Sequence, residues 1–136
     1  MPLYFVDTWF FIAYLHKYDS DHEAALRLGR SLRDAKFVTH DGVLLELLTF
    51  FAGHGPFWRE QVAAYAREVI SGHRFQTKAL SRELFEQALA LYERRLDKEY
   101  SLVDCMSMTL MRRRDITGIL TNDHHFQQEG FVVLNR

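Results

Sequence analysis

Leu3-Tyr4-Phe5-Val6-Asp7-Thr8 is the stretch that decides the fold, because an apolar run ends there at an acid and a helical pattern begins at once. A short continuous apolar run is typical of a strand that is buried on both faces. Open α/β sheets bind ligands beyond the carboxyl ends of their strands, so Asp7 is predicted at a ligand-binding edge. The alternative is that Asp7 only caps the following helix, a position that Asp favours.

Short apolar segments alternate with helical patterns along the rest of the chain. Further strands are predicted at 37–39, 73–77, 117–120 and 131–134, and helices at 8–16, 20–34, 42–52, 56–70, 81–96 and 101–113. This alternation predicts an α/β fold, a three-layer sandwich in which a parallel sheet of four to five strands is flanked by helices. No linker or repeat interrupts the pattern, so residues 1–136 are expected to form a single domain.

The composition narrows the class of protein. The formal net charge of the 136 residues is −1, which gives no sign of a general polyanion binder. Cys105 is the single cysteine, so an internal disulfide and a cysteine-based zinc site are excluded. The N-terminus lacks the pattern of a signal peptide, and no apolar stretch reaches the ~20 residues of a membrane helix. We therefore expect a cytoplasmic protein with no membrane association.

Glu46 is the most informative single residue, since it lies in the apolar segment Val43–Phe51. A helix this apolar is expected to be buried on most sides. An isolated buried carboxylate is costly unless it is paired or bound to a cation, so Glu46 is a candidate metal ligand. The alternative is that Glu46 lies on an exposed stripe of the helix and is simply solvated.

Two further acids have both a structural and a chemical interpretation. Asp104 follows Ser101 by three residues, which matches a capping box at a helix start. Asp123 follows the apolar segment that ends at Thr121, and it could form an Asx-turn. Its position also repeats that of Asp7, an acid that follows a buried strand.

In a parallel sheet the carboxyl ends of all strands lie at one edge, so these four acids can converge. Converging carboxylates repel one another unless a cation is present. Ligation by oxygen alone selects a hard ion, Mg²⁺ or Mn²⁺. Such a site suits hydrolysis of phosphodiesters, because the ion activates water and neutralises the charge of the phosphate.

In order and in local context, these segments resemble the PIN-domain ribonucleases, and most closely their toxin-type, VapC-like members. The resemblance covers nearly the whole chain and is most specific from Tyr100 to Leu134. It is carried by Leu3–Thr8, by Glu46 after Val38-Thr39, by Ser101-Leu102-Val103-Asp104-Cys105 with Ser107, and by Thr121-Asn122-Asp123-His124-His125-Phe126.

The resemblance implies a metal-dependent endoribonuclease that binds Mg²⁺ or Mn²⁺. It implies that Asp7, Glu46, Asp104 and Asp123 are both the catalytic and the metal-binding residues. Thr8, Ser107 and Thr121 are similar to the small hydroxyl residues beside the family's pocket, and we expect them to orient acids or water. Family resemblance also implies an RNA substrate, a cognate antitoxin protein that covers the active site, and a homodimer.

Other interpretations stay open at this stage. The chain could be a PIN nuclease of RNA processing rather than a toxin, or a catalytically silent module that binds RNA or protein. A phosphatase with an Asp nucleophile is disfavoured, because that class needs a second Asp two residues after the first and Trp9 stands there. His124 and His125 are not expected to bind a metal, since no third ligand of the zinc type has motif spacing.

Overall fold

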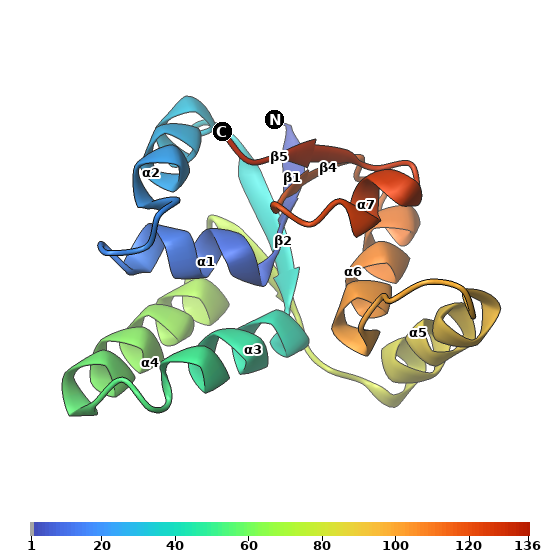
Figure 1. Cartoon of the computed structure of the whole chain (residues 1–136), viewed down its shortest axis with the longest axis horizontal. Coiled ribbons are helices and arrows are strands. Elements are labelled where there is room, and N and C mark those ends of the chain that lie inside the picture. The colour runs from blue at the N-terminus through green and yellow to red at the C-terminus, as the bar shows by residue number, and fades with distance from the viewer. Residues whose placement is uncertain (1) are drawn as a thin grey trace.

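A computed structural model describes residues 2–136, in which five strands form one parallel sheet of order β3-β2-β1-β4-β5 (Figure 1). The strands are β1 (Leu3–Val6), β2 (Lys36–His40), β3 (Phe75–Lys78), β4 (Gly118–Leu120) and β5 (Val132–Leu134). The prediction of a parallel sheet of four to five strands is confirmed, with five strands present.

Helices cover both faces of the sheet, so the molecule has three layers. They are α1 (Thr8–Leu15), α2 (His22–Ser31), α3 (Asp41–Phe51), α4 (Pro56–Ser71), α5 (Arg82–Arg94), α6 (Leu102–Arg113) and α7 (His125–Gln128). Helices α1 to α4 lie on one side of the strands and α5 to α7 on the other (Figure 1). Helix α2 begins two residues later than predicted, because Asp19 forms an Asx-turn with the Asp21 amide and holds that segment in a turn.

The central position of β1 explains its apolar sequence. Phe5 of β1 lies beside Val38 of β2 on one side and beside Ile119 of β4 on the other. Phe5 and Val6 are fully buried, as expected for a parallel strand with helices on both faces. Asp7 therefore lies at the end of the central strand, with β2 on one side of that strand and β4 on the other.

The N-terminus of α3 is capped by a histidine side chain. The cap is the ring of His40, whose Nδ1 accepts a hydrogen bond from the Gly42 amide at 3.0 Å. Nε2 of His40 therefore carries the proton and donates to Oγ of Ser107 at 2.9 Å. A Cβ atom on Gly42 would lie 2.8 Å from the His40 ring, so only glycine leaves room for this cap.

Burial lowers the pKa of His40 to about 4, so the ring is neutral in the folded protein at pH 7. The unfolded chain takes up this proton near pH 6.5, and stability is therefore lost as the pH falls from about 6.5 towards 4. We predict that the stability advantage of wild type over His40→Gln shrinks by about 2 kcal/mol between pH 7 and pH 4.5. Urea unfolding of both proteins at the two pH values measures this difference, and an unchanged advantage would contradict a neutral buried His40.

Among the described residues, none of the helices is both long and apolar enough to cross a bilayer.

Candidate active site

The four predicted acids come from four different elements that meet at the carboxyl edge of the sheet (Figure 1). Asp7 follows β1 and Asp123 follows β4, while Asp104 lies in the first turn of α6 and Glu46 in the middle of α3. The charges of Asp104 and Glu46 both raise the pKa of Asp7, and those of Asp123 and Glu46 raise the pKa of Asp104. The structure thus brings the four carboxylates into one electrostatic cluster.

Asp7 is the buried member of the cluster, with 7% of its surface exposed. It occupies the N-cap position of α1 but makes no capping hydrogen bond through its side chain. Oδ2 of Asp7 instead accepts a hydrogen bond from Oγ1 of Thr121 at 2.8 Å. Burial raises the pKa of Asp7 to about 7, the neighbouring charges act in the same direction, and the Thr121 hydrogen bond opposes them.

Asp104 and Asp123 each have the structural role that their sequence context indicated. Asp104 and Ser101 form a reciprocal capping box, in which Oδ2 of Asp104 accepts from the Ser101 amide at 3.1 Å. Oδ1 of Asp123 accepts from the His125 amide at 2.9 Å, which is an Asx-turn. Each local bond uses one carboxylate oxygen, so capping and a second role are compatible.

The structure corrects the expectation that Glu46 is buried in an apolar helix. Glu46 is exposed, and so are its neighbours Leu45 and Leu48, so this face of α3 is open to solvent in the part of the chain that the structure describes. Oε1 of Glu46 accepts a hydrogen bond from Oγ1 of Thr8 at 2.6 Å. Glu46 therefore lies on the exposed side of the acid cluster, and Thr8 of α1 orients its carboxylate. Its burial is not what makes it a candidate ligand for a cation.

Of the three predicted hydroxyl residues, Thr8 and Thr121 contact acids and Ser107 does not. Thr121 bridges two of them, since it donates to Asp7 and accepts from the Asp123 amide at 3.1 Å. Ser107 is fully buried and bonds to His40 and to the Val103 carbonyl. Its hydroxyl fixes the start of α3, which is a different task from the one expected.

His125, which the sequence analysis did not expect to bind a metal, lies beside two of the acids. Its Nδ1 lies 3.1 Å from Oδ1 of Asp123 and 3.9 Å from Oδ2 of Asp104. This nitrogen is buried and has no hydrogen-bond partner within residues 2–136. Ligand atoms of Asp104, Asp123 and His125 all lie within 4.8 Å of one another, a set that fits a divalent cation with mixed oxygen and nitrogen ligands. The spacing Asp-x-His across a turn was the available sequence signal.

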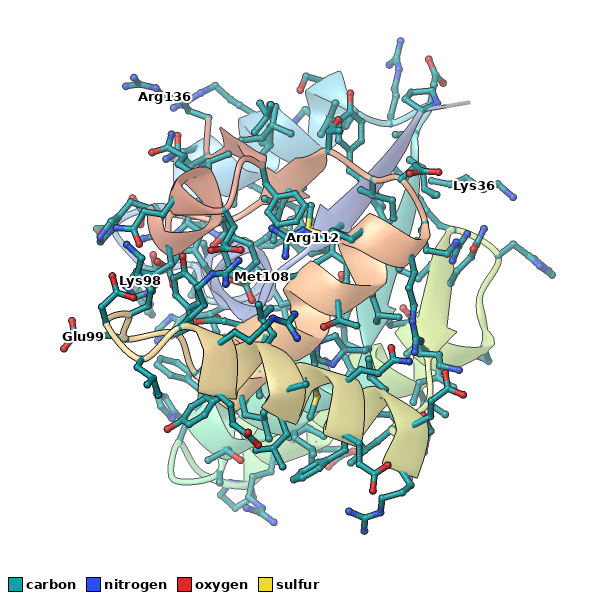
Figure 2. The ribbon with its side chains drawn as sticks, turned by 90° about the vertical axis from the view of Figure 1, so that its right-hand side faces the viewer. Lys36, Lys98, Glu99, Met108, Arg112 and Arg136 are labelled. Carbon is teal, nitrogen blue, oxygen red and sulfur yellow. The ribbon has the colours of Figure 1, made fainter. Side chains whose placement is uncertain are left out.

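A buried ion-pair network supports the segment that carries Asp123 and His125. Glu129, whose side chain is 5% exposed, accepts hydrogen bonds from Arg95 at 2.8 Å, from Arg112 at 2.8 Å and from the Tyr100 hydroxyl at 3.0 Å. Arg112 reaches Glu129 from α6, the orange helix beside which Arg112 and Met108 are labelled in Figure 2. Chiefly because of the Arg95 hydrogen bond, the pKa of Glu129 falls to about 2. The network joins α7 to the ends of α5 and α6.

The sequence of the chain is similar to a known family and to a known protein. A sequence model of the PIN domain matches residues 4–131. The 23S rRNA-specific endonuclease VapC20 of Mycobacterium tuberculosis is 34% identical over 131 residues, which cover 94% of this chain and 95% of that protein.

Two solved structures have the same fold. The crystal structure of Mycobacterium tuberculosis VapC20, described as a sarcin-ricin loop cleaving toxin, superposes with a TM-score of 0.86 at 27% identity and covers 99% of this chain and 100% of that one. The structure of VapBC2 from Rickettsia felis, bound to a DNA fragment from their promoter, has a TM-score of 0.70 at 14% identity and covers 98% of each chain. The second match is evidence of the fold alone.

Proposed function

The chain belongs to the PIN-domain family, and from this premise we propose that it is a metal-dependent endoribonuclease and the toxin of a toxin–antitoxin pair. Asp7, Glu46, Asp104 and Asp123 are the proposed catalytic and metal-binding residues. His125 joins them as a proposed nitrogen ligand. The proposed cofactor is Mg²⁺ or Mn²⁺, and the nitrogen ligand favours Mn²⁺ of the two.

The proposal rests on one observation. In each of the partly exposed acids, one carboxylate oxygen accepts a hydrogen bond and the other oxygen has none within residues 2–136. In Glu46, Asp104 and Asp123 one carboxylate oxygen is held by Thr8, by the Ser101 amide or by the His125 amide. Carboxylates that are fixed in orientation, mutually repulsive and open on one side are arranged for a divalent cation.

The residues have separable tasks in this proposal. The Thr121 hydroxyl links the Asp7 carboxylate to the Asp123 amide, and the Thr8 hydroxyl orients the Glu46 carboxylate. Burial keeps the pKa of Asp7 near neutrality without a cation, so a bound ion would favour the charged form of this carboxyl. When bound, the ion supplies an activated water and neutralises charge on the phosphate.

The proposed substrate is a structured RNA. The relative that matches 94% of this chain is named for its action on 23S rRNA, and its crystal structure is described as that of a sarcin-ricin loop cleaving toxin. We propose the same class of target here, a hairpin of ribosomal RNA, cleaved in the cytoplasm.

An apolar groove beside the acids supports an antitoxin as the protein partner. The groove has a volume of about 630 Å³ and is lined by residues of α1, α3 and α6 together with Leu80 and Phe85. Its lining includes Thr8 and Glu46. Leu45 and Phe50 are 57% and 42% exposed. A segment that buries apolar residues in this groove and extends a cationic side chain to the acids would block the site. The homodimer stays part of the proposal and is checked by light scattering of the purified protein.

The experiment that tests the function is cleavage of a synthetic sarcin-ricin hairpin RNA by purified protein with Mg²⁺, with Mn²⁺ and with excess EDTA. We expect cleavage with either ion, and a rate at least ~10³-fold lower in EDTA, since removal of the ion removes both water activation and charge neutralisation. Cleavage that persists in EDTA would contradict the metal site.

Asp104→Asn, purified in parallel, controls for contaminating nucleases. Asn keeps an oxygen that can accept the Ser101 hydrogen bond but carries no charge, so the protein should fold and not cleave. Asp115→Asn is the matched variant, because Asp115 is exposed and its φ of 53° suits asparagine. If the wild-type protein binds Mn²⁺ but does not cleave the RNA, the alternative of a non-catalytic binding module would be favoured.

A further inference from the structure

A second cavity lies at the opposite end of the strands from the acids. It has a volume of about 360 Å³ and is enclosed by α1, α2, α4 and the starts of β2 and β3. Phe37 is the second residue of β2 and Phe75 the first of β3, so the cavity sits at the amino edge of the sheet. This volume is within the range of small-molecule sites.

Aromatic rings form the walls of this cavity. Phe10 and Tyr14 of α1 stack with ring centroids 5.5 Å apart and planes at 20°, and the rings of Phe37 and Phe75 lie 5.3 Å apart. Tyr65 of α4 completes the lining. Phe10 and Phe37 are only 5% and 4% exposed, whereas Tyr14 is 37% exposed, so the aromatic surface open to an occupant comes mainly from Tyr14, Tyr65 and Phe75. An aromatic surface of this kind favours a flat ring as the occupant.

Three arginines surround the opening, namely Arg30, Arg33 and Arg74. Within residues 2–136 none of them has a carboxylate oxygen within 4.0 Å, whereas Arg95, Arg112 and Arg113 are all paired. Arg74 is held in place, because its Nη2 donates to the Leu32 carbonyl at 2.8 Å and its guanidinium lies 4.8 Å from the centre of the Phe37 ring. Uncompensated guanidinium groups beside a pocket favour an anion, and above all a phosphate.

The lining also contains a hydrogen-bond donor, the Tyr65 hydroxyl, and a glycine, Gly29, at a position where a side chain would fit. The Tyr65 hydroxyl has no hydrogen-bond partner within the described chain, and burial raises the pKa of Tyr65, so this group keeps its proton. Gly29 lies within α2, where glycine is less favourable for helix stability than alanine. A Cβ on Gly29 would point towards Phe10 and Tyr14 at 3.7 and 3.8 Å without a clash, so the fold does not require glycine there, and its absent side chain keeps the cavity open.

We propose that this cavity binds a nucleotide, with the base against the aromatic surface of Tyr14, Tyr65 and Phe75 and the phosphate on Arg30, Arg33 and Arg74. The nucleotide is either a free mononucleotide or one unit of an RNA strand. The inference does not rest on the proposed nuclease function, since no residue of the acid cluster lines the cavity.

The test is a titration of the ¹⁵N-labelled protein in EDTA with AMP and, separately, with a tetra-adenylate RNA, followed by amide chemical shifts. We expect saturable shifts at Gly29, Arg30 and Phe75, and at least tenfold weaker binding of adenosine and of inorganic phosphate alone. Equal affinity for AMP and the RNA identifies a free nucleotide as the ligand, and at least tenfold tighter RNA binding identifies a strand.

Two variants decide whether the cavity is the binding site. Gly29→Leu fills it without removing a charge, and Arg33→Ala removes a charge without filling it; each should weaken AMP or RNA binding at least tenfold. Arg27→Ala is the matched control, since Arg27 is an exposed arginine of α2 outside the lining. Shifts that appear only around Asp104 and Asp123, no saturable shift at all, or binding that both variants leave intact would overturn the proposal.

Discussion

Asp7→Asn should abolish RNA cleavage and at the same time stabilise the metal-free protein. Loss of the buried charge at the centre of the cluster is expected to reduce the cleavage rate by at least ~10³-fold, the scale of losing a key electrostatic group. Burial raises the pKa of Asp7 to about 7, so the folded protein binds this proton more tightly than the unfolded chain does. Ionisation of Asp7 therefore destabilises the fold as the pH rises from about 4 to 7.

The stability gain from Asp7→Asn is expected to grow over this pH interval to at most roughly 4 kcal/mol, since one pKa unit corresponds to about 1.4 kcal/mol. The Asn side chain still offers an oxygen to the Thr121 hydroxyl. Thermal unfolding in EDTA at pH 4.5 and pH 8 measures the gain. Addition of Mn²⁺ should raise the melting temperature of wild type and leave that of Asp7→Asn nearly unchanged.

Asp115→Asn again serves as the control, with activity and stability close to wild type. An Asp7→Asn protein that is less stable than wild type at pH 8 would contradict the raised pKa of Asp7. A variant that is more stable but still cleaves RNA would remove Asp7 from the catalytic set.

Glu129→Ala should lower the free energy of unfolding by roughly 1.5–3 kcal/mol, because it removes charge-assisted hydrogen bonds that a side chain 5% exposed accepts from Arg95 and Arg112. The lower end of the usual range applies, since the side chains of Arg95 and Arg112 are 33% and 45% exposed and can be hydrated. The pKa of Glu129 is depressed to about 2, so its contribution is present above about pH 4.5 and is lost as the pH falls towards 2.

Activity should fall as well, because Glu129 joins α7, which begins at His125, to α5 and α6. Urea unfolding and RNA cleavage at fixed Mn²⁺ measure the two effects. Glu83→Ala is the control, since Glu83 pairs with Arg113 through a side chain that is 73% exposed, and such pairs contribute at most about 1 kcal/mol. Equal losses in the two variants would contradict a special role for the buried network.

The sequence predicted the order of elements because the strands are short, apolar and separated by clear helical patterns. Asp7 and Asp123 could be placed at one edge from this order alone, since both directly follow a buried strand. Asp104 could be located from its capping pattern with Ser101. In each case the local sequence determines the backbone, and the topology of a parallel sheet then brings the side chains together.

Other features depend on contacts between distant segments and could not be predicted. Glu46 was expected to be buried, because an apolar helix is indistinguishable in sequence from one that exposes an apolar face beside the active site. The His40 cap depends on Ser107, which is 67 residues away. The Glu129 network joins residues that no short motif connects.

The hydrogen bond between Thr121 and Asp7 links residues 114 positions apart, and it has a consequence for how the protein is made. While the chain is being translated, β1 emerges from the ribosome first but has no β4 to pair with until residues 118–120 follow. Asp7 consequently lacks both β4 and its orienting hydroxyl until residues 118–121 have emerged. A nascent polypeptide that stops just before Thr121 therefore has no assembled acid cluster, although Asp7, Glu46 and Asp104 have all been synthesised.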